Sequence, residues 1–204
     1  TGGGRITLAG GTTTDANGLP TGYATSNLAA DGAGGVSLGT NVTGGGTSWV
    51  KLYSGGGDIA IRGSSSQAKG ILVPSGYDIN SGTGSITLDG KSTGTTASYN
   101  GEGVELVYGG TVNAASNMTS AKTSGTAISI TGQSTATSSF GVISNNWSSG
   151  LVSTISATGG GDIVITGTGP TDGQFKYNNI LANGGNITFD MSTNGATFAN
   201  CNIG

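Results

Sequence analysis

The chain has 204 residues, of which 42 are glycine, 8% are charged and none is histidine, and its formal net charge is −3. Its seven Lys and Arg residues are scattered, whereas nucleic-acid binding requires a basic patch, so nucleic acid is not an expected partner. A glycine-rich, weakly charged composition can indicate disorder, but the apolar residues here recur periodically and can therefore build a core.

Short strands in which apolar and polar residues alternate recur along the chain. The clearest is Gly-Asp-Ile-Val-Ile-Thr-Gly (161–167), which nearly repeats Gly-Asp-Ile-Ala-Ile-Arg-Gly (57–63). Alternation with period two indicates a strand with one buried face, and we expect the flanking glycines to end it. In chain order the copies are Ile6/Leu8, Val36/Leu38, Ile59/Ile61, Ile86/Leu88, Ile128/Ile130, Ile163/Ile165 and Ile187/Phe189. Repetition of one short unit predicts a repeat protein.

Two further strand patterns lie between the copies. One comprises Ile71/Val73, Val104/Leu106, Phe140/Val142 and Phe175/Tyr177. The other comprises Leu28/Ala30, Val50/Leu52, Ile79/Ser81, Val112/Ala114, Ile155/Ala157 and Ile180/Ala182. Three strands per turn predict an all-β, three-faced solenoid whose equivalent strands are parallel. Parallel crossovers are strongly right-handed, so the prediction is a right-handed parallel β-helix of about seven coils.

The whole chain, residues 1–204, is predicted to be one β-helical segment. It begins Thr1-Gly2-Gly3-Gly4, already within repeat-like sequence, and we expect it to be excised from a longer chain. Irregular spacing of the copies predicts insertions near residues 9–27, 115–125 and 144–154. Loops that grow on a regular scaffold commonly carry recognition.

The last insertion supplies the candidate ligand-binding residues, Asn145, Asn146 and Trp147. Two interpretations of Trp147 stay open. Its indole either covers the apolar edge beneath its own loop or forms an exposed platform on which a sugar or protein partner stacks.

Neither catalysis nor metal binding is expected from the remaining side chains. Glycoside cleavage needs two carboxylates close together on one face, but Asp58 and Asp162 are predicted to lie three coils apart. Glu102 and Glu105 flank one strand entry and are predicted to be a solvated pair. The single cysteine, Cys201, can form neither an internal disulfide nor a metal cluster. We therefore predict a non-enzyme without cofactor or metal; the alternative is a β-helical polysaccharide lyase or glycosidase, or a carbohydrate-binding module.

Two side-chain contacts between neighbouring coils follow from the same register. Arg62 and Asp89 occupy equivalent positions after the first-face strand and are predicted to form an exposed salt bridge. Asn80 and Asn113 are predicted to stack on the third face. No apolar run approaches the roughly 20 residues of a membrane helix, so insertion into a membrane is not expected.

Several of the repeated strings resemble a known family. GGGDIVITG (159–167), GTGSITLDG (82–90) and ISATGGGDI (155–163) are similar to repeats of filamentous-haemagglutinin-type adhesins and large exoproteins. The resemblance implies a bacterial surface or secreted adhesin, exported by two-partner secretion through an outer-membrane transporter. It also implies attachment to a host or neighbouring cell surface, with glycans among the candidate ligands. The family's Asn-Pro secretion motifs are missing, because no Asn precedes Pro20, Pro74 or Pro170. If the resemblance holds, we therefore expect an internal segment and not the export domain.

Overall fold

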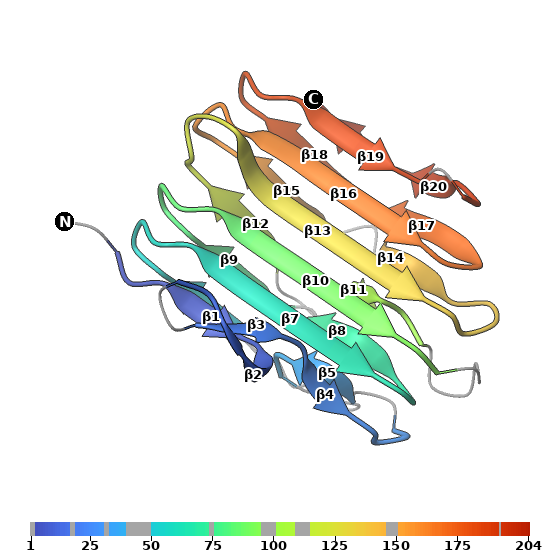
Figure 1. The fold of residues 1–204 in the computed structure, drawn as a ribbon. Coiled ribbons are helices and arrows are strands. Elements are labelled where there is room, and N and C mark those ends of the chain that lie inside the picture. The colour runs from blue at the N-terminus through green and yellow to red at the C-terminus, as the bar shows by residue number, and fades with distance from the viewer. Residues whose placement is uncertain are drawn as a thin grey trace.

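The computed structural model describes residues 3–16, 19–30, 33–39, 50–73, 76–94, 101–108, 115–145, 151–191 and 193–204. Within these ranges every regular element is a β-strand. Within each large sheet the strands follow one another from the N-terminal to the C-terminal end of the chain, as β7, β10, β13, β16 and β19 do in Figure 1. The all-β class is therefore confirmed.

Three parallel sheets contain nearly all of these strands. The first sheet consists of β1 (Ile6–Leu8), β7 (Ile59–Ser65), β10 (Ile86–Ser92), β13 (Thr126–Ser134), β16 (Asp162–Thr168) and β19 (Ile187–Asp190), with β4 (Ala24–Ser26) also paired to β7. The second consists of β5 (Gly34–Ser37), β8 (Lys69–Val73), β11 (Val104–Tyr108), β14 (Phe140–Asn145), β17 (Thr171–Lys176) and β20 (Ala196–Ala199). The third consists of β6 (Val50–Tyr53), β9 (Tyr77–Asn80), β12 (Asn117–Ser120), β15 (Ser153–Ala157), β18 (Asn178–Ala182) and β21 (Asn202–Ile203).

From β5 onward, successive strands belong to the second, third and first sheets in turn. From β8 onward, each strand therefore pairs in parallel with the strand three places earlier in the chain. We call three successive strands, one in each sheet, a rung. The sheets contain six strands each along these paths, in the part of the chain that the structure describes. The predicted parallel stacking is thus confirmed, and the arrangement is compatible with a β-solenoid.

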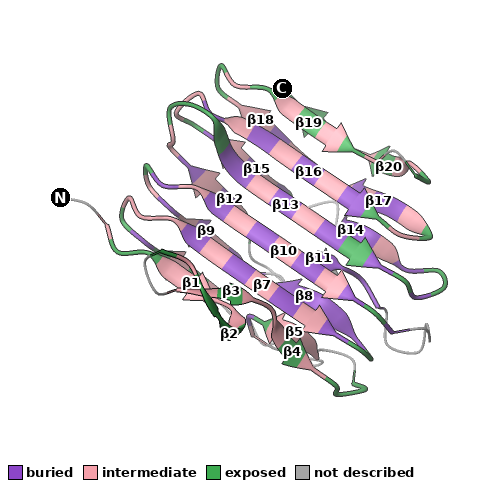
Figure 2. Ribbon diagram, viewed as in Figure 1, coloured by how far each residue is buried: buried purple, intermediate pink, exposed green. Residues whose placement is uncertain are grey.

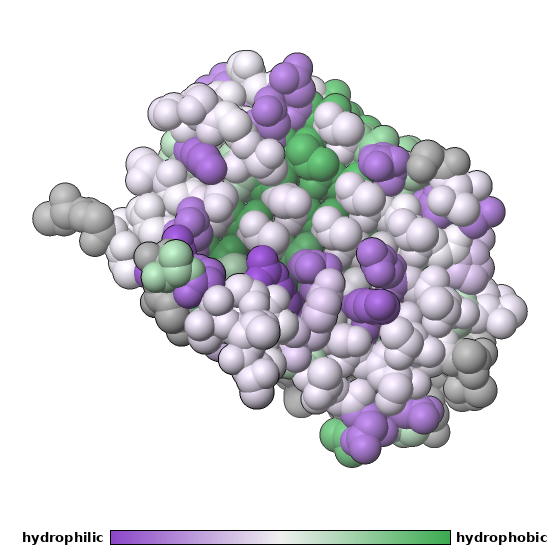
Figure 3. All heavy atoms as spheres, viewed as in Figure 1, coloured by the Kyte–Doolittle hydropathy of each residue, from purple (hydrophilic) through white to green (hydrophobic). Residues whose placement is uncertain are grey.

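The core lies between the sheets and is built from columns of equivalent residues. One column of the first sheet aligns Ile59, Ile86, Ile128 and Ile163, and the next aligns Ile61, Leu88, Ile130 and Ile165. All eight side chains are fully buried, whereas the residues between them, such as Val164, are only partly buried. Burial alternates along β7, β10, β13 and β16 (Figure 2), as predicted. Weakly polar side chains predominate on the outer face of this sheet (Figure 3).

One predicted copy belongs to a different sheet. Val36 lies in β5 and aligns with Ile71 of β8, so the pair Val36/Leu38 continues the second sheet, not the first. The reason is that β1 and β4 together already occupy the first-sheet position beside β7. The prediction for Leu28/Ala30 was also wrong, because neither residue lies in a strand and Leu28 is 65% exposed.

The predicted insertion at 115–125 contains a strand of the third sheet. Residues 117–120 form β12, and Met118 fills the core column between Ile79 and Ile155. A single apolar residue among small polar ones gave no alternating pattern, and the strand was therefore missed. Asn80 aligns with Thr119. Val112, Asn113 and Ala114 lie outside the described residues.

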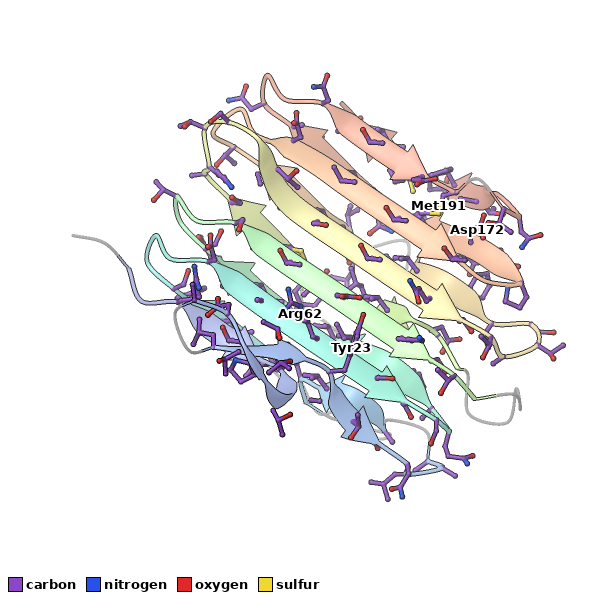
Figure 4. All side chains as sticks on the ribbon, viewed as in Figure 1. Tyr23, Arg62, Asp172 and Met191 are labelled. Atoms are coloured by element: carbon purple, nitrogen blue, oxygen red, sulfur yellow. The ribbon has the colours of Figure 1, made fainter. Side chains whose placement is uncertain are left out.

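Part of the range 9–27, which was predicted to be an insertion, lies outside the parallel stack. It forms an antiparallel hairpin of β2 (Gly10–Thr14) and β3 (Pro20–Gly22), and the chain then rejoins the first sheet as β4. The Tyr23 hydroxyl donates to both carboxylate oxygens of Asp89, at 3.0 and 2.9 Å. Arg62, which does align with Asp89, donates to the Thr21 carbonyl at 3.1 Å. The side chains of Tyr23 and Arg62 lie together where the hairpin meets β7 (Figure 4). Two residues expected to pair with each other thus both contact the hairpin segment.

Connections between sheets differ in how much their length varies. From the third sheet to the first they run through residues 54–58, 81–85, 121–125, 158–161 and 183–186. From the second sheet to the third they range from Tyr177 alone to residues 38–49, and include 146–152. The predicted insertion at 144–154 falls at this second corner, although Ser144 and Asn145 still belong to β14 and residues 153–154 to β15.

Glycines in the first sheet allow the second sheet to approach closely. Gly63, Gly90, Gly132 and Gly167 align in one column, which we call the glycine column. A Cβ on any of them would lie 2.0–2.2 Å from a carbonyl oxygen that belongs to a strand of the second sheet or, for Gly90, to Gly103 directly before β11. We had expected these glycines to end their strands, and that expectation was wrong. Each strand continues past the glycine, and the residue is required for close backbone packing.

Asp172 fastens the turn that precedes β20. Its carboxylate Oδ2 accepts backbone N–H groups of Thr193, Asn194 and Gly195 at 2.9, 2.6 and 3.0 Å, and Oδ1 accepts that of Gly169 at 3.2 Å. The side chain is fully buried near the C-terminal end of the stack (Figure 4). Burial by itself raises the pKa of this carboxyl group, but the four N–H donors together bring the pKa below its ordinary value.

This arrangement predicts acid sensitivity. Because the folded-state pKa of Asp172 is lowered, its contribution to stability is present above the ordinary Asp pKa of about 3.9 and is lost as the pH falls through the folded-state pKa. Asp172→Asn should lower the free energy of unfolding at neutral pH by about 1–3 kcal/mol, since N–H donors lose a charged acceptor. It should also flatten the acid limb of a melting-temperature profile. Asp190→Asn, at an exposed position, is the control, and an equal flattening by both variants would contradict the assignment.

Candidate ligand-binding site

Of the three predicted ligand-binding residues, the structure describes Asn145. It is the last residue of β14 and only 5% exposed, so it belongs to the second sheet and not to a projecting loop. Its Nδ2 donates to Oε1 of Gln174 on β17 at 2.9 Å, and the buried Oδ1 has no hydrogen-bond partner among the described residues. Asn146 and Trp147 lie outside the described residues and follow Asn145 directly in the chain.

An open hollow of about 360 Å³ lies beside Asn145. It is lined by side chains from the last strands of the second sheet: Phe140, Asn145, Gln174, Phe175, Lys176, Thr197 and Ala199. Gln174 and Lys176 flank the core residue Phe175 in β17, so alternation directs both to the outer face of the sheet. The sequence did not indicate this hollow, because its residues come from three rungs and their pairing is known only from the register.

The chemistry of the hollow suits a ligand with many hydroxyl groups. Gln174 offers an amide that its hydrogen bond from Asn145 orients, Thr197 offers a hydroxyl and Lys176 an ammonium group, so donors and acceptors converge. The partly buried ring of Phe140 supplies an apolar surface of the kind that packs against a sugar ring. The Lys176 ammonium also lies 5.4 Å from the Tyr177 ring centroid, a cation–π distance that helps to position it.

Neighbouring side chains make the wall of the hollow rigid. The Ser144 hydroxyl donates to Oδ1 of Asn178 at 2.7 Å, and Asn178 Nδ2 donates back to the Ser144 carbonyl at 2.8 Å and to the Lys176 carbonyl at 2.9 Å. These bonds tie the ends of β14 and β17 together. A binding site whose backbone is fixed in this way loses little entropy when a ligand enters.

A second groove, of about 200 Å³, lies between the hairpin and the first sheet. Its charged groups pair with one another: Arg5 lies 3.2 Å from Asp15 and 3.5 Å from Asp58. The N–H of Ser85 lowers the pKa of Asp58; burial opposes this, and the Ser85 hydroxyl, Arg5 and Lys122 lower it further. A carboxyl group held in its ionised form is a poor general acid at neutral pH. This groove is therefore the weaker candidate.

The repeated Asp before the first-sheet strands has a structural role. Asp58 Oδ1 accepts the backbone N–H of Ser85, and Asp162 Oδ1 accepts that of Asn186, each at 2.8 Å. Each carboxylate thus caps the entry of the corresponding strand one rung later. This explains why both Gly-Asp-Ile strings contain the acid.

The expectation for Glu102 and Glu105 was wrong. Both are buried, at 4% and 0% exposure, and Lys69 Nζ lies 3.5 Å from Glu105 Oε2. Leu72 and Ile143 align with Glu105 on the outer side of the second sheet, and both are fully buried as well. Around these residues of β8, β11 and β14, the outer face is therefore not open to solvent. Sequence alternation alone assigns that side to water and so could not reveal this.

Comparisons with known proteins gave no relatives. No protein-family model matches the chain, and neither curated proteins nor solved structures contain a match. Within the described ranges, no three His, Cys, Asp or Glu residues gather closely enough to hold a metal ion. The described residues also include no helix long and apolar enough to span a membrane.

Proposed function

We propose that the chain is a non-catalytic segment of a right-handed parallel β-helix in a bacterial surface or secreted adhesin, and that it contacts glycans through the hollow beside Asn145. The carrying observation is the convergence of Asn145, Gln174, Lys176 and Thr197 around one open cavity on a rigid sheet. The strong preference of parallel crossovers supports the right hand. The repeated strings support about seven coils, and the sheet paths of six strands each, in the described part of the chain, are compatible with a solenoid of about that size.

The shaft role rests on the continuity of the stack. Core columns run from β1 to β19 without a break in register at their central residues. A linear array of this kind transmits force and holds a ligand site at a distance from its anchor. The similarity of the repeated strings to filamentous-haemagglutinin-type adhesins supports an extracellular location, export through an outer-membrane transporter, and attachment to a host or neighbouring cell.

A glycan array tests the binding site. The purified chain should bind a subset of glycans, and Gln174→Ala combined with Lys176→Ala should weaken that binding at least tenfold, because about 1.4 kcal/mol of contact energy corresponds to that factor. Thr131→Ala, on the outer face of the first sheet, is the matched control and should bind as the parent does. Loss of binding by the control alone, or no glycan binding by the parent chain, would refute the proposal.

Trp147→Ala separates the two interpretations of that residue. If the indole stacks on a sugar, the variant keeps its melting temperature and loses affinity for the glycan. If the indole covers the core edge, the melting temperature falls. Cleavage of a polysaccharide by the purified chain would instead establish the enzyme alternative.

A further inference from the structure

A cluster of buried charged side chains lies in and beside the second sheet. It belongs neither to the apolar core nor to the lining of the hollow beside Asn145. Lys69 begins β8, and Glu105 lies in β11, the adjacent strand. Both side chains are fully excluded from solvent, and Nζ of Lys69 lies 3.5 Å from Oε2 of Glu105. Glu102 is also buried and lies next to Lys69, because its carbonyl oxygen accepts the backbone N–H of Gly70 at 2.9 Å. An amine and a carboxyl group are therefore held in contact in a site closed to water.

Such burial changes what this pair can do. In water, an ammonium ion and a carboxylate do not react with each other, because the nitrogen has no free electron pair. Away from water, separated charges lose their hydration, and transfer of the proton from Lys69 to Glu105 removes both charges. A neutral, desolvated lysine amine is a nucleophile.

We propose that Lys69 and Glu105 are joined by an amide bond between Nζ and the side-chain carboxyl carbon. After proton transfer, the Nζ electron pair attacks that carbon, and the bond from the carbon to the protonated oxygen breaks. The departing hydroxyl group takes one proton from the nitrogen and leaves as water. We assign the transfer of that proton from nitrogen to oxygen to the carboxyl group of Glu102, because Glu102 is buried and its backbone bonds the residue after Lys69. Atoms and electrons balance without an oxidant or reductant, and loss of the water molecule from a closed site disfavours hydrolysis.

The bond would join adjacent strands of the second sheet and hence adjacent rungs of the stack. The other contacts described between rungs are noncovalent: hydrogen bonds, packing and the ion pair of Arg5 with Asp58. With Cys201 as its single cysteine, the chain has no internal disulfide available for this purpose. A covalent link would keep the two rungs together even when the hydrogen-bonded ladder opens.

Mass spectrometry of the intact, denatured full chain tests the proposal. The expected mass is lower than the sequence mass by one water molecule, and proteolysis should release a branched peptide in which Lys69 is linked to Glu105. Lys69→Met and Glu105→Leu should each show the full mass of their sequences, and circular dichroism establishes whether they fold. Glu102→Gln should reduce the cross-linked fraction, and an unchanged fraction would remove Glu102 from the step.

The parent chain decides the matter whether or not the variants fold. A parent mass equal to the full sequence mass would overturn the proposal and leave Lys69 and Glu105 as an ion pair. Loss of water that maps to other residues, or that persists in Lys69→Met, would overturn it as well. None of these outcomes depends on glycan binding, so this proposal and the proposed function can fail independently.

Discussion

Gly132→Ala is expected to lower the free energy of unfolding by about 3 kcal/mol, the upper end of the usual cost of overpacking in a core. A Cβ at this position would lie 2.0 Å from the carbonyl oxygen and 2.7 Å from the carbonyl carbon of Gly141. Both atoms belong to the backbone of β14, which pairs with β11 and β17 and cannot move without breaking one of the ladders. The clash therefore cannot be relieved by a small movement of β14.

Thermal unfolding followed by circular dichroism measures this effect. For a chain of this size, the melting temperature should fall by about 10 °C. Gly4→Ala is the matched control, because a Cβ there meets no atom within 4 Å and the residue is exposed. Equal melting temperatures for the two variants would mean that the first and second sheets do not meet at the glycine column.

Ile163→Asp should destabilise the chain by several kcal/mol, whereas the same change at Val164 should cost less than about 1 kcal/mol. The Ile163 side chain is fully buried between Ile128 and Ile187 in its column, and a carboxylate there finds no water and no partner. Val164 points to the outer face of the same strand and is partly exposed. Urea unfolding of both variants compares two chains that differ only in which of two adjacent positions carries the charge. A similar loss in both would contradict the register of β16.

The sequence predicted the first sheet well because that sheet follows the simplest rule. Its strands expose one face to water, so Ile59 and Ile61 alternate with Ala60 and Arg62, and the burial follows the pattern residue by residue. The second sheet does not obey that rule: Leu72 and Glu105 lie on its outer side and are nevertheless fully buried. Alternation cannot distinguish an outer face open to water from one that is covered.

The candidate site shows a related limit. Asn145 was singled out because it precedes Trp147 in a predicted loop, yet its observed partner is Gln174, 29 positions away. That contact depends on the pairing of β14 with β17, which in turn depends on the lengths of all intervening connections. Local sequence indicates which residues are strand-like, but only the register shows which side chains converge.

The unequal corners of the stack suggest how this architecture could be altered. Connections from the third sheet to the first stay close to one length, whereas those from the second to the third range from Tyr177 alone to residues 38–49, with the strands on either side still aligned. Residues can therefore be inserted in the connection from the second sheet to the third without changing the alignment of the strands on either side. Peptides grafted at that second corner would be displayed in a row along one side, spaced by the distance between neighbouring strands, roughly 4.8 Å per rung. Several epitopes could thus be displayed on one molecule at separations that are multiples of the spacing between rungs.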